Sequence, residues 1–344
     1  MRKTDFETVA AEPTAALGVA RQRQAGIRSS QKILPTRQTS LANPVSLEGV
    51  GLHSGAPVRL TLRPAAADTG WLFRRTDLGV SERAVTDIRL APEAVCETVL
   101  NTTIGNAAGT KISTIEHLMA AVAGLSVDNL IIEINGPEVP IMDGSAADFA
   151  AAIQQAGVRV LGMPRKYIRV LKPVVVEDGI KRVEIAPYDG FRLEFEIEFD
   201  SPVIGHETMS VDLTDETFRA EVCSARTFGF LKDVEAMWAV GLARGGSLEN
   251  SIVIDGAKVL NEGGLRFADE FVRHKVLDAV GDLSVAGAPL LARYSGVRAG
   301  HAINNQALRA LFADADAWEY VTLTDRQPAR ETARPVAAIA VSAD

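Results

Sequence analysis

Apolar and polar side chains alternate without interruption over residues 191–199. Successive side chains of a β-strand point to opposite faces, so the pattern predicts a strand with one apolar face and one charged, solvated face. Residues 58–64 alternate in the same way and predict a second half-buried strand. Strands of this kind need other elements packed against their apolar faces.

The rest of the chain divides into short strands and helices. Further strands are predicted at residues 71–75, 129–135, 167–172, 174–177, 181–186 and 251–255. Helices are predicted at residues 113–125, 146–156, 214–223, 271–287 and 304–312, with another helical piece ending at 237–241. In each half, antiparallel-type strands are followed by helices. This order favours an α+β fold of small, mainly antiparallel sheets layered against helices over a parallel βαβ array.

Composition shifts give the predicted domain boundaries. Residues 1–38 hold scattered basic side chains without a clear period and lack the apolar core of a secretory signal, so we expect a poorly ordered extension. Residues 161–166 have the composition of a linker. We therefore expect one domain at residues 39–162, a second at 163–325 and a tail at 326–344.

Bulk composition excludes several classes of protein. The 344 residues are 47% hydrophobic and carry a net charge of −8, so a nucleic-acid partner is not expected. No apolar run approaches the ~18 residues that a membrane span needs. The chain has two cysteines, Cys96 and Cys223, which are too few for a disulfide framework. We expect both to be free, buried thiols in a reducing compartment, the cytoplasm.

One predicted helix carries an arrangement typical of metal binding. His274, Asp278 and Asp282 are spaced four residues apart, so they project from one helix face. His274 and Asp278 can grip a single ion from that face, although such pairs also occur as plain hydrogen bonds. Asp282 can orient another imidazole or simply be solvated.

A second segment supplies the complementary groups. His117 can add a third ligand and leave a fourth position open, as in catalytic zinc sites. Glu116 beside it is then a candidate general base. An alternative remains open for Glu116, because Ser113 three residues earlier completes a capping-box pattern.

His301 follows a glycine and precedes two asparagines that could cap a helix. Its position allows two interpretations. It is either an ordinary loop histidine or a general acid that protonates a leaving group.

Together these segments resemble the family of UDP-3-O-acyl-N-acetylglucosamine deacetylases, zinc enzymes of bacterial lipid A synthesis. The resemblance runs in the family's order from about residue 39 to about 325. It rests on residues 49–55, 113–118, 137–145, 225–230, 259–267, 271–282 and 300–305.

The resemblance implies a monomer with two similar α+β domains and an active site between them. It implies that the first domain supplies Glu116 as the base and His117 as a ligand. The second domain then supplies the other zinc ligands and the remaining catalytic groups. The family pattern assigns metal binding to His117, His274 and Asp278, catalysis to Glu116, His301, Asp282 and Thr227, and substrate binding to Lys275, Phe199, Phe228, Gly229 and His53.

The implied reaction is hydrolysis of the N-acetyl group of UDP-3-O-acyl-N-acetylglucosamine, which yields acetate and a free amine. Zn²⁺ is the expected ion, although a His₂Asp set can also hold Fe²⁺. Two other hypotheses stay open: a zinc amidohydrolase that acts on another nucleotide sugar or a peptide, and a non-catalytic binding protein with a structural zinc. A structural site should be closed by four protein ligands, whereas the sequence offers three.

Overall fold

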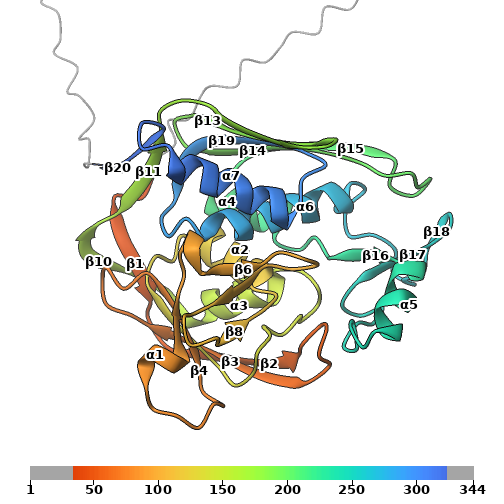
Figure 1. Cartoon of the computed structure of the whole chain (residues 1–344), viewed down its shortest axis with the longest axis horizontal. Helices are drawn as coiled ribbons and strands as arrows, with labels where there is room; N and C mark the ends of the chain where they lie inside the picture. The colour runs from red at the N-terminus through yellow and green to blue at the C-terminus, as the bar shows by residue number, and fades with distance from the viewer. Residues whose placement is uncertain (1–33, 324–344) are drawn as a thin grey trace, which may run out of the picture. The chain divides into compact units, whose positions relative to one another are not determined.

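The computed structural model describes residues 34–323 of the chain. Two sheets dominate this part of the chain, and helices lie between them (Figure 1). Buried apolar side chains from both sheets and from the helices belong to one continuous hydrophobic core. The predicted α+β fold is confirmed. The predictions for residues 1–33 and 324–344 concern parts of the chain outside the described residues.

The first sheet has the strand order β2-β3-β9-β4-β5. Its strands are β2 (Val45–Val50), β3 (Pro57–Pro64), β9 (Leu130–Ile134), β4 (Trp71–Arg75) and β5 (Asp87–Arg89). Neighbours are antiparallel except β4 and β9, which are parallel. On β3, Val58, Leu60 and Leu62 are buried, as the alternation predicted.

The second sheet contains the order β12-β13-β19, with β14 joining β19 and β15 joining β14. These strands are β12 (Val174–Asp178), β13 (Lys181–Pro187), β19 (Leu290–Val297), β14 (Phe191–Glu198) and β15 (His206–Asp212). Strands β11 (Lys166–Val170) and β20 (Trp318–Thr322) extend it. On β14, Leu193, Phe195 and Ile197 are buried, which confirms the predicted strand.

The two sheets share one strand order. In the first sheet, β9 lies between β3 and β4 and is parallel only to β4. In the second sheet, β19 lies between β13 and β14 and is parallel to β14. Strand β19 is also parallel to the added strand β11. The sequence showed this similarity only as a loosely shared order of elements. The strand order is the same in the two sheets even though the side chains on corresponding strands differ.

Four helices pack between the two sheets. They are α2 (Glu116–Gly124), α3 (Ala147–Ala156), α6 (Glu270–Ser284) and α7 (His301–Ala313). Helices α2 and α6 precede the inserted strands β9 and β19, and the two helices pack against each other (Figure 1). Among the described helices, none is both long and apolar enough to cross a membrane.

Smaller elements flank this framework. One small sheet consists of β6 (Val95–Glu97), β7 (Thr103–Gly105) and β8 (Lys111–Ile112), and another of β16 (Phe228–Phe230), β17 (Ile252–Asp255) and β18 (Lys258–Val259). The short helices are α1 (Arg83–Thr86), α4 (Asp215–Thr217), which continues into a π-helical turn (Phe218–Val222), and α5 (Leu231–Ala239).

A glycine allows α2 and α6 to approach closely. A Cβ atom added to Gly281 of α6 would lie 2.0 Å from the backbone oxygen of Glu116 on α2. Any larger residue would therefore force the two helices apart. The close contact between these helices therefore depends on a glycine, which has no side chain, at position 281.

Two predictions are wrong here. Residues 161–166 are not a linker, because β10 (Val158–Pro164) pairs with β1 (Arg37–Leu41). Both faces of β10 are largely exposed, so the alternation that marks half-buried strands is missing. Cys96 is a free but exposed thiol, whereas Cys223 is free and buried. The domain boundary at residues 162 and 163 stays a prediction.

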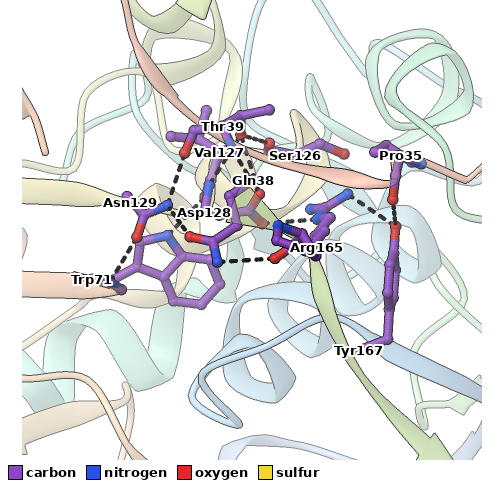
Figure 2. Close-up of polar contacts among 12 residues, drawn as sticks. Pro35, Gln38, Thr39, Trp71, Ser126, Val127, Asp128, Asn129, Arg165 and Tyr167 are labelled. Carbon is purple, nitrogen blue, oxygen red and sulfur yellow. Dashed lines mark hydrogen bonds and ion pairs between the residues drawn. The ribbon is translucent and has the colours of Figure 1, made fainter. Parts of the chain in front are cut away.

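A buried polar network links β1 and the start of β11 to the loop before β9 (Figure 2). The Arg165 Nε donates to Asp128 Oδ1 at 2.9 Å, and the Thr39 backbone N–H donates to Asp128 Oδ2 at 2.9 Å. Asn129 Nδ2 donates to Gln38 Oε1 at 3.0 Å. Because buried polar groups need such partners, this network fixes β1 and β11 against the first sheet.

Candidate active site

Three side chains of metal-ligand type converge where α2 meets α6. His117 Nε2 lies 3.5 Å from Asp278 Oδ1, and His274 Nε2 lies 3.3 Å from the same oxygen. One ligand atom from each residue falls within 4.8 Å of the others, and all three residues are buried. The structure therefore brings together the two segments that the sequence analysis paired.

The carboxylate of Asp278 has two different environments. Its Oδ2 accepts a hydrogen bond from Lys275 Nζ at 2.6 Å. Its Oδ1 is buried and has no hydrogen-bond partner among the described residues. Burying a charged oxygen without a partner is costly, so this oxygen, facing two imidazole nitrogens, fits a cation.

His274 is held in the form that binds metal. Its Nδ1 lies 3.0 Å from the Ala225 carbonyl oxygen, to which it can donate, and this leaves Nε2 as the acceptor that faces Asp278. Burial lowers the pKa of His274 to about 4. The imidazole is therefore neutral at neutral pH, as metal coordination requires.

The charge of Asp278 is stabilised by its neighbours. Burial by itself would raise the pKa of this carboxyl, but the charge of His274 in its protonated form and the charge of Lys275 hold it well below its ordinary value. Burial likewise opposes the charge on Lys275, and Asp278 raises the pKa of Lys275 in return. An ionised aspartate and a neutral histidine together form a suitable donor set for a divalent ion.

Glu116, the first residue of α2, does not cap its helix. The α2 N-terminus has no side-chain cap, and the Ser113 hydroxyl donates to the Pro137 carbonyl at 3.3 Å instead. The Glu116 Oε2 accepts from the backbone N–H of Thr102 at 3.1 Å. The capping-box interpretation is therefore wrong. Burial raises the pKa of Glu116, which suits a group that gains and loses a proton.

His301 begins α7 and is paired with Asp282 of α6. His301 Nδ1 lies 2.9 Å from Asp282 Oδ2, and His301 Nε2 lies 4.0 Å from Glu116 Oε1. Burial opposes protonation of this imidazole, but Asp282 outweighs that effect and raises the pKa of His301 to about 10. The imidazole is therefore protonated at neutral pH and can act as a proton donor.

Sequence reasoning missed three buried residues behind this pair. Asn304 Nδ2 donates to Asp282 Oδ2 at 2.8 Å, and Tyr294 OH donates to Asn304 Oδ1 at 2.6 Å. Thr102 Oγ1 donates to Asp282 Oδ1 at 2.7 Å. Only the position of Asn304, one helical turn after His301, gave any signal in the sequence.

A buried ion pair anchors the segment that contains Thr227. Arg226 Nε and Nη2 donate to the two carboxylate oxygens of Glu270 at 2.9 and 3.1 Å. The Thr227 backbone N–H donates to the Gly144 carbonyl at 2.8 Å. Thr227 follows Ala225 by two residues in the chain, and the Ala225 carbonyl contacts His274. The contacts of Arg226 and Thr227 therefore hold the backbone of this segment beside His274.

Aromatic side chains border the ligand cluster. The Phe228 ring lies 6.2 Å from the His274 ring and 5.8 Å from the Phe199 ring, measured between centroids. Gly229 follows Phe228 on β16. Three of the residues predicted to bind substrate therefore share one apolar neighbourhood beside His274.

His53 is the predicted residue that the described contacts leave outside this cluster. Its backbone N–H donates at 2.7 Å to Glu138, a buried carboxylate whose same oxygen lies 3.4 Å from the Thr114 hydroxyl. Both ring nitrogens of His53 are shielded and have no partner among the described residues. Burial lowers the pKa of His53.

Neutral histidine, ionised aspartate and a buried glutamate beside the ligands are typical of hydrolytic metalloenzymes. The LpxC family model, described as UDP-3-O-acyl N-acetylglycosamine deacetylase, matches residues 38–313. The chain belongs to this family.

Individual relatives agree with the family match. A protein of Phenylobacterium zucineum (strain HLK1) is 52% identical over 288 residues, which cover 84% of this chain and 97% of the relative. A protein of Aliivibrio fischeri (strain ATCC 700601 / ES114) is 49% identical, with 85% and 95% coverage. A third, of Pseudomonas entomophila (strain L48), is 49% identical, with 88% and 99% coverage. Each is named UDP-3-O-acyl-N-acetylglucosamine deacetylase.

Proposed function

We propose that this chain hydrolyses the N-acetyl group of UDP-3-O-acyl-N-acetylglucosamine to acetate and a free amine, a step of lipid A biosynthesis. Membership of the deacetylase family supports this function, as do the names of relatives that match most of the chain. The observation that carries the proposal is the buried group of His117, His274 and Asp278 beside Glu116.

His117, His274 and Asp278 would hold the metal ion, and Zn²⁺ is the ion we propose. The unpartnered Asp278 oxygen between two imidazole nitrogens supports this assignment. Three protein ligands leave a coordination position open, which favours a catalytic over a closed structural site. The same donors also suit Fe²⁺. When bound, the ion supplies Lewis acidity and lowers the pKa of water from near 16 to about 7.

Glu116 acts as the general base. Its carboxylate is buried next to the ligand His117, and burial raises its pKa toward the range in which a base works near neutral pH. We propose that Glu116 takes a proton from water as the water oxygen attacks the acetyl carbon. The Thr102 N–H keeps Oε2 of Glu116 in place, and Oε1 lies 4.0 Å from His301 Nε2.

His301 acts as the general acid. Asp282 raises its pKa and accepts from Nδ1, so the proton on Nε2 is available for the departing amine nitrogen. The 4.0 Å separation between His301 Nε2 and Glu116 Oε1 supports a reaction in which the two groups serve opposite sides of one amide. Asp282 orients the imidazole and does not touch the reacting atoms.

The remaining residues bind the substrate. We propose that the Thr227 hydroxyl donates to the oxyanion of the tetrahedral intermediate. Lys275 offers a partly exposed ammonium beside Asp278 for a polar group of the substrate. Phe199, Phe228 and Gly229 border the site on its apolar side, and we assign His53 a substrate contact from the loop held by Glu138.

We also propose that the protein works as a monomer in the cytoplasm. The resemblance to the family supports the monomer. The two free cysteines fit a reducing compartment.

Release of acetate from the acylated nucleotide sugar tests this function. The purified full chain should convert UDP-3-O-acyl-N-acetylglucosamine to the amine and acetate, and UDP-N-acetylglucosamine without the acyl chain should react far more slowly. Chelation should abolish the activity and added Zn²⁺ should restore it. A metal-loaded protein that releases no acetate from the acylated substrate would refute the proposal.

A further inference from the structure

Thr102, a residue to which the sequence pattern gives no role, directs all of its polar groups at the site. It lies between β6 and β7 and is 3% exposed. Its backbone N–H donates to Glu116 Oε2 at 3.1 Å, and its hydroxyl donates to Asp282 Oδ1 at 2.7 Å. Its carbonyl accepts from the N–H of Ile115, which precedes Glu116, at 3.3 Å.

The two carboxylates that share Thr102 belong to different helices. Glu116 begins α2, and Asp282 lies on α6. Both are 3% exposed, so each depends on protein donors rather than water. The two donors of Thr102 are only a few covalent bonds apart on a buried residue, and therefore they restrict the positions of the two carboxylates relative to each other.

The hydroxyl of Thr102 also controls how Asp282 faces His301. Asp282 Oδ2 accepts from Asn304 and His301, whereas Oδ1 has Thr102 at 2.7 Å and His301 at 3.1 Å. Without the hydroxyl, Oδ1 would keep only the longer of its two contacts. The carboxylate could then rotate, and the imidazole bonded to it would rotate as well.

We propose that Thr102 is a positioning residue that holds the general base and the acid-orienting carboxylate at a fixed separation. Removal of a proton by Glu116 and delivery of a proton by His301 then occur at groups anchored to one point. This inference rests on the roles proposed for Glu116 and His301. Thr102 does not touch the substrate and acts through Glu116 and Asp282.

Replacing the hydroxyl gives the first test. Thr102→Val keeps the backbone N–H and the shape of the side chain but removes the donor to Asp282. We expect kcat to fall by about tenfold or more, with KM little changed, because the lost contact matters when His301 delivers its proton. Thr102→Ser, which keeps the hydroxyl, should recover most of the rate. Metal content and thermal midpoint should show that each variant is folded and loaded.

Thr110→Val is the matched control. Thr110 is buried, and its hydroxyl donates to the Val85 carbonyl at 2.7 Å, away from both carboxylates. This variant loses one buried hydrogen bond, as Thr102→Val does, but should keep its kcat. If Thr102→Val does not fold, Thr102→Ala removes the same hydroxyl with less crowding. Failure of both to fold would make the residue structural and would overturn the proposal.

A double-mutant cycle identifies the route of the effect. In a His301→Gln background, Thr102→Val should change the residual rate less than about twofold, because its target is already gone. The loss in Thr102→Val should also stay below the loss in His301→Gln. A full Thr102→Val loss in that background, or no loss in the wild-type background, would overturn the inference. Absence of acetate release by the wild-type protein would instead refute the proposed function itself.

Discussion

His301 Nδ1 lies 2.9 Å from Asp282 Oδ2, and the two residues belong to different helices, α7 and α6. Asp282 is buried and only 13% of the His301 side chain is exposed, so the charged pair is largely held away from water. The free energy of unfolding therefore depends on the protonation state of the His301 imidazole.

This relationship predicts how stability depends on pH. Asp282 raises the pKa of His301 from 6.5 to about 10, so folding favours the protonated form. The stabilisation is fully present below pH 6.5 and is lost as the pH rises toward about 10. The difference in unfolding free energy between metal-free wild type and metal-free His301→Gln should shrink across that window in urea titrations. A difference that stays constant with pH would contradict the raised pKa.

Replacing Asp278, which faces both histidines, should weaken metal binding. Asp278→Ala deletes the oxygen that faces both histidine Nε2 atoms, so we expect metal affinity to fall by more than about 100-fold, the upper range for loss of an outer partner. Metal content after gel filtration measures the effect. Asp282→Asn, altered on the same helix one turn away, should keep its metal. Equal metal content in both variants would show that Asp278 is not a ligand.

Glu116→Ala should separate metal binding from turnover. The three ligand side chains stay in place, so metal content should match that of the wild type. Acetate release should fall about 10²–10⁴-fold, because a positioned general base contributes on that order. Full activity in this variant would remove the base assignment.

Gly281→Ala should damage the site without touching a ligand. The new Cβ would lie 2.0 Å from the Glu116 backbone oxygen, and backbone cannot swing aside as a flexible side chain can. We expect a loss of about 1–3 kcal/mol in the free energy of unfolding, the usual cost of overpacking, together with weaker metal binding. Gly263→Ala, where a Cβ meets nothing within 4 Å, is the control for denaturant unfolding and metal titration. An unchanged thermal midpoint in Gly281→Ala would mean that the helices can separate freely.

Much of the fold follows from local pattern. Strict alternation identified β14 and β3, and spacing along one helix face brought out His274 and Asp278, because both signals lie within a few residues of one another. Strand β10 escaped detection since its partner β1 is more than 100 residues away in sequence and neither of its faces is buried against a core. Exposed strands carry no alternation for sequence reasoning to detect.

The candidate site shows the same limit. The side chain of Glu116 was open to two interpretations because a capping box is a local pattern, whereas its actual partner, the Thr102 N–H, arrives from another segment. Tyr294 reaches Asp282 only through Asn304, so no spacing in the chain could reveal it. Residues that touch metal or substrate have distinctive chemistry, but those that hold them in place are ordinary amino acids.

The matching strand order of the two sheets puts α2 and α6 at corresponding places, and each supplies part of the candidate metal site. The proposed chemistry therefore requires both helices, because neither carries all three proposed metal ligands. We expect a separation of α2 from α6 to abolish the proposed activity before either sheet unfolds.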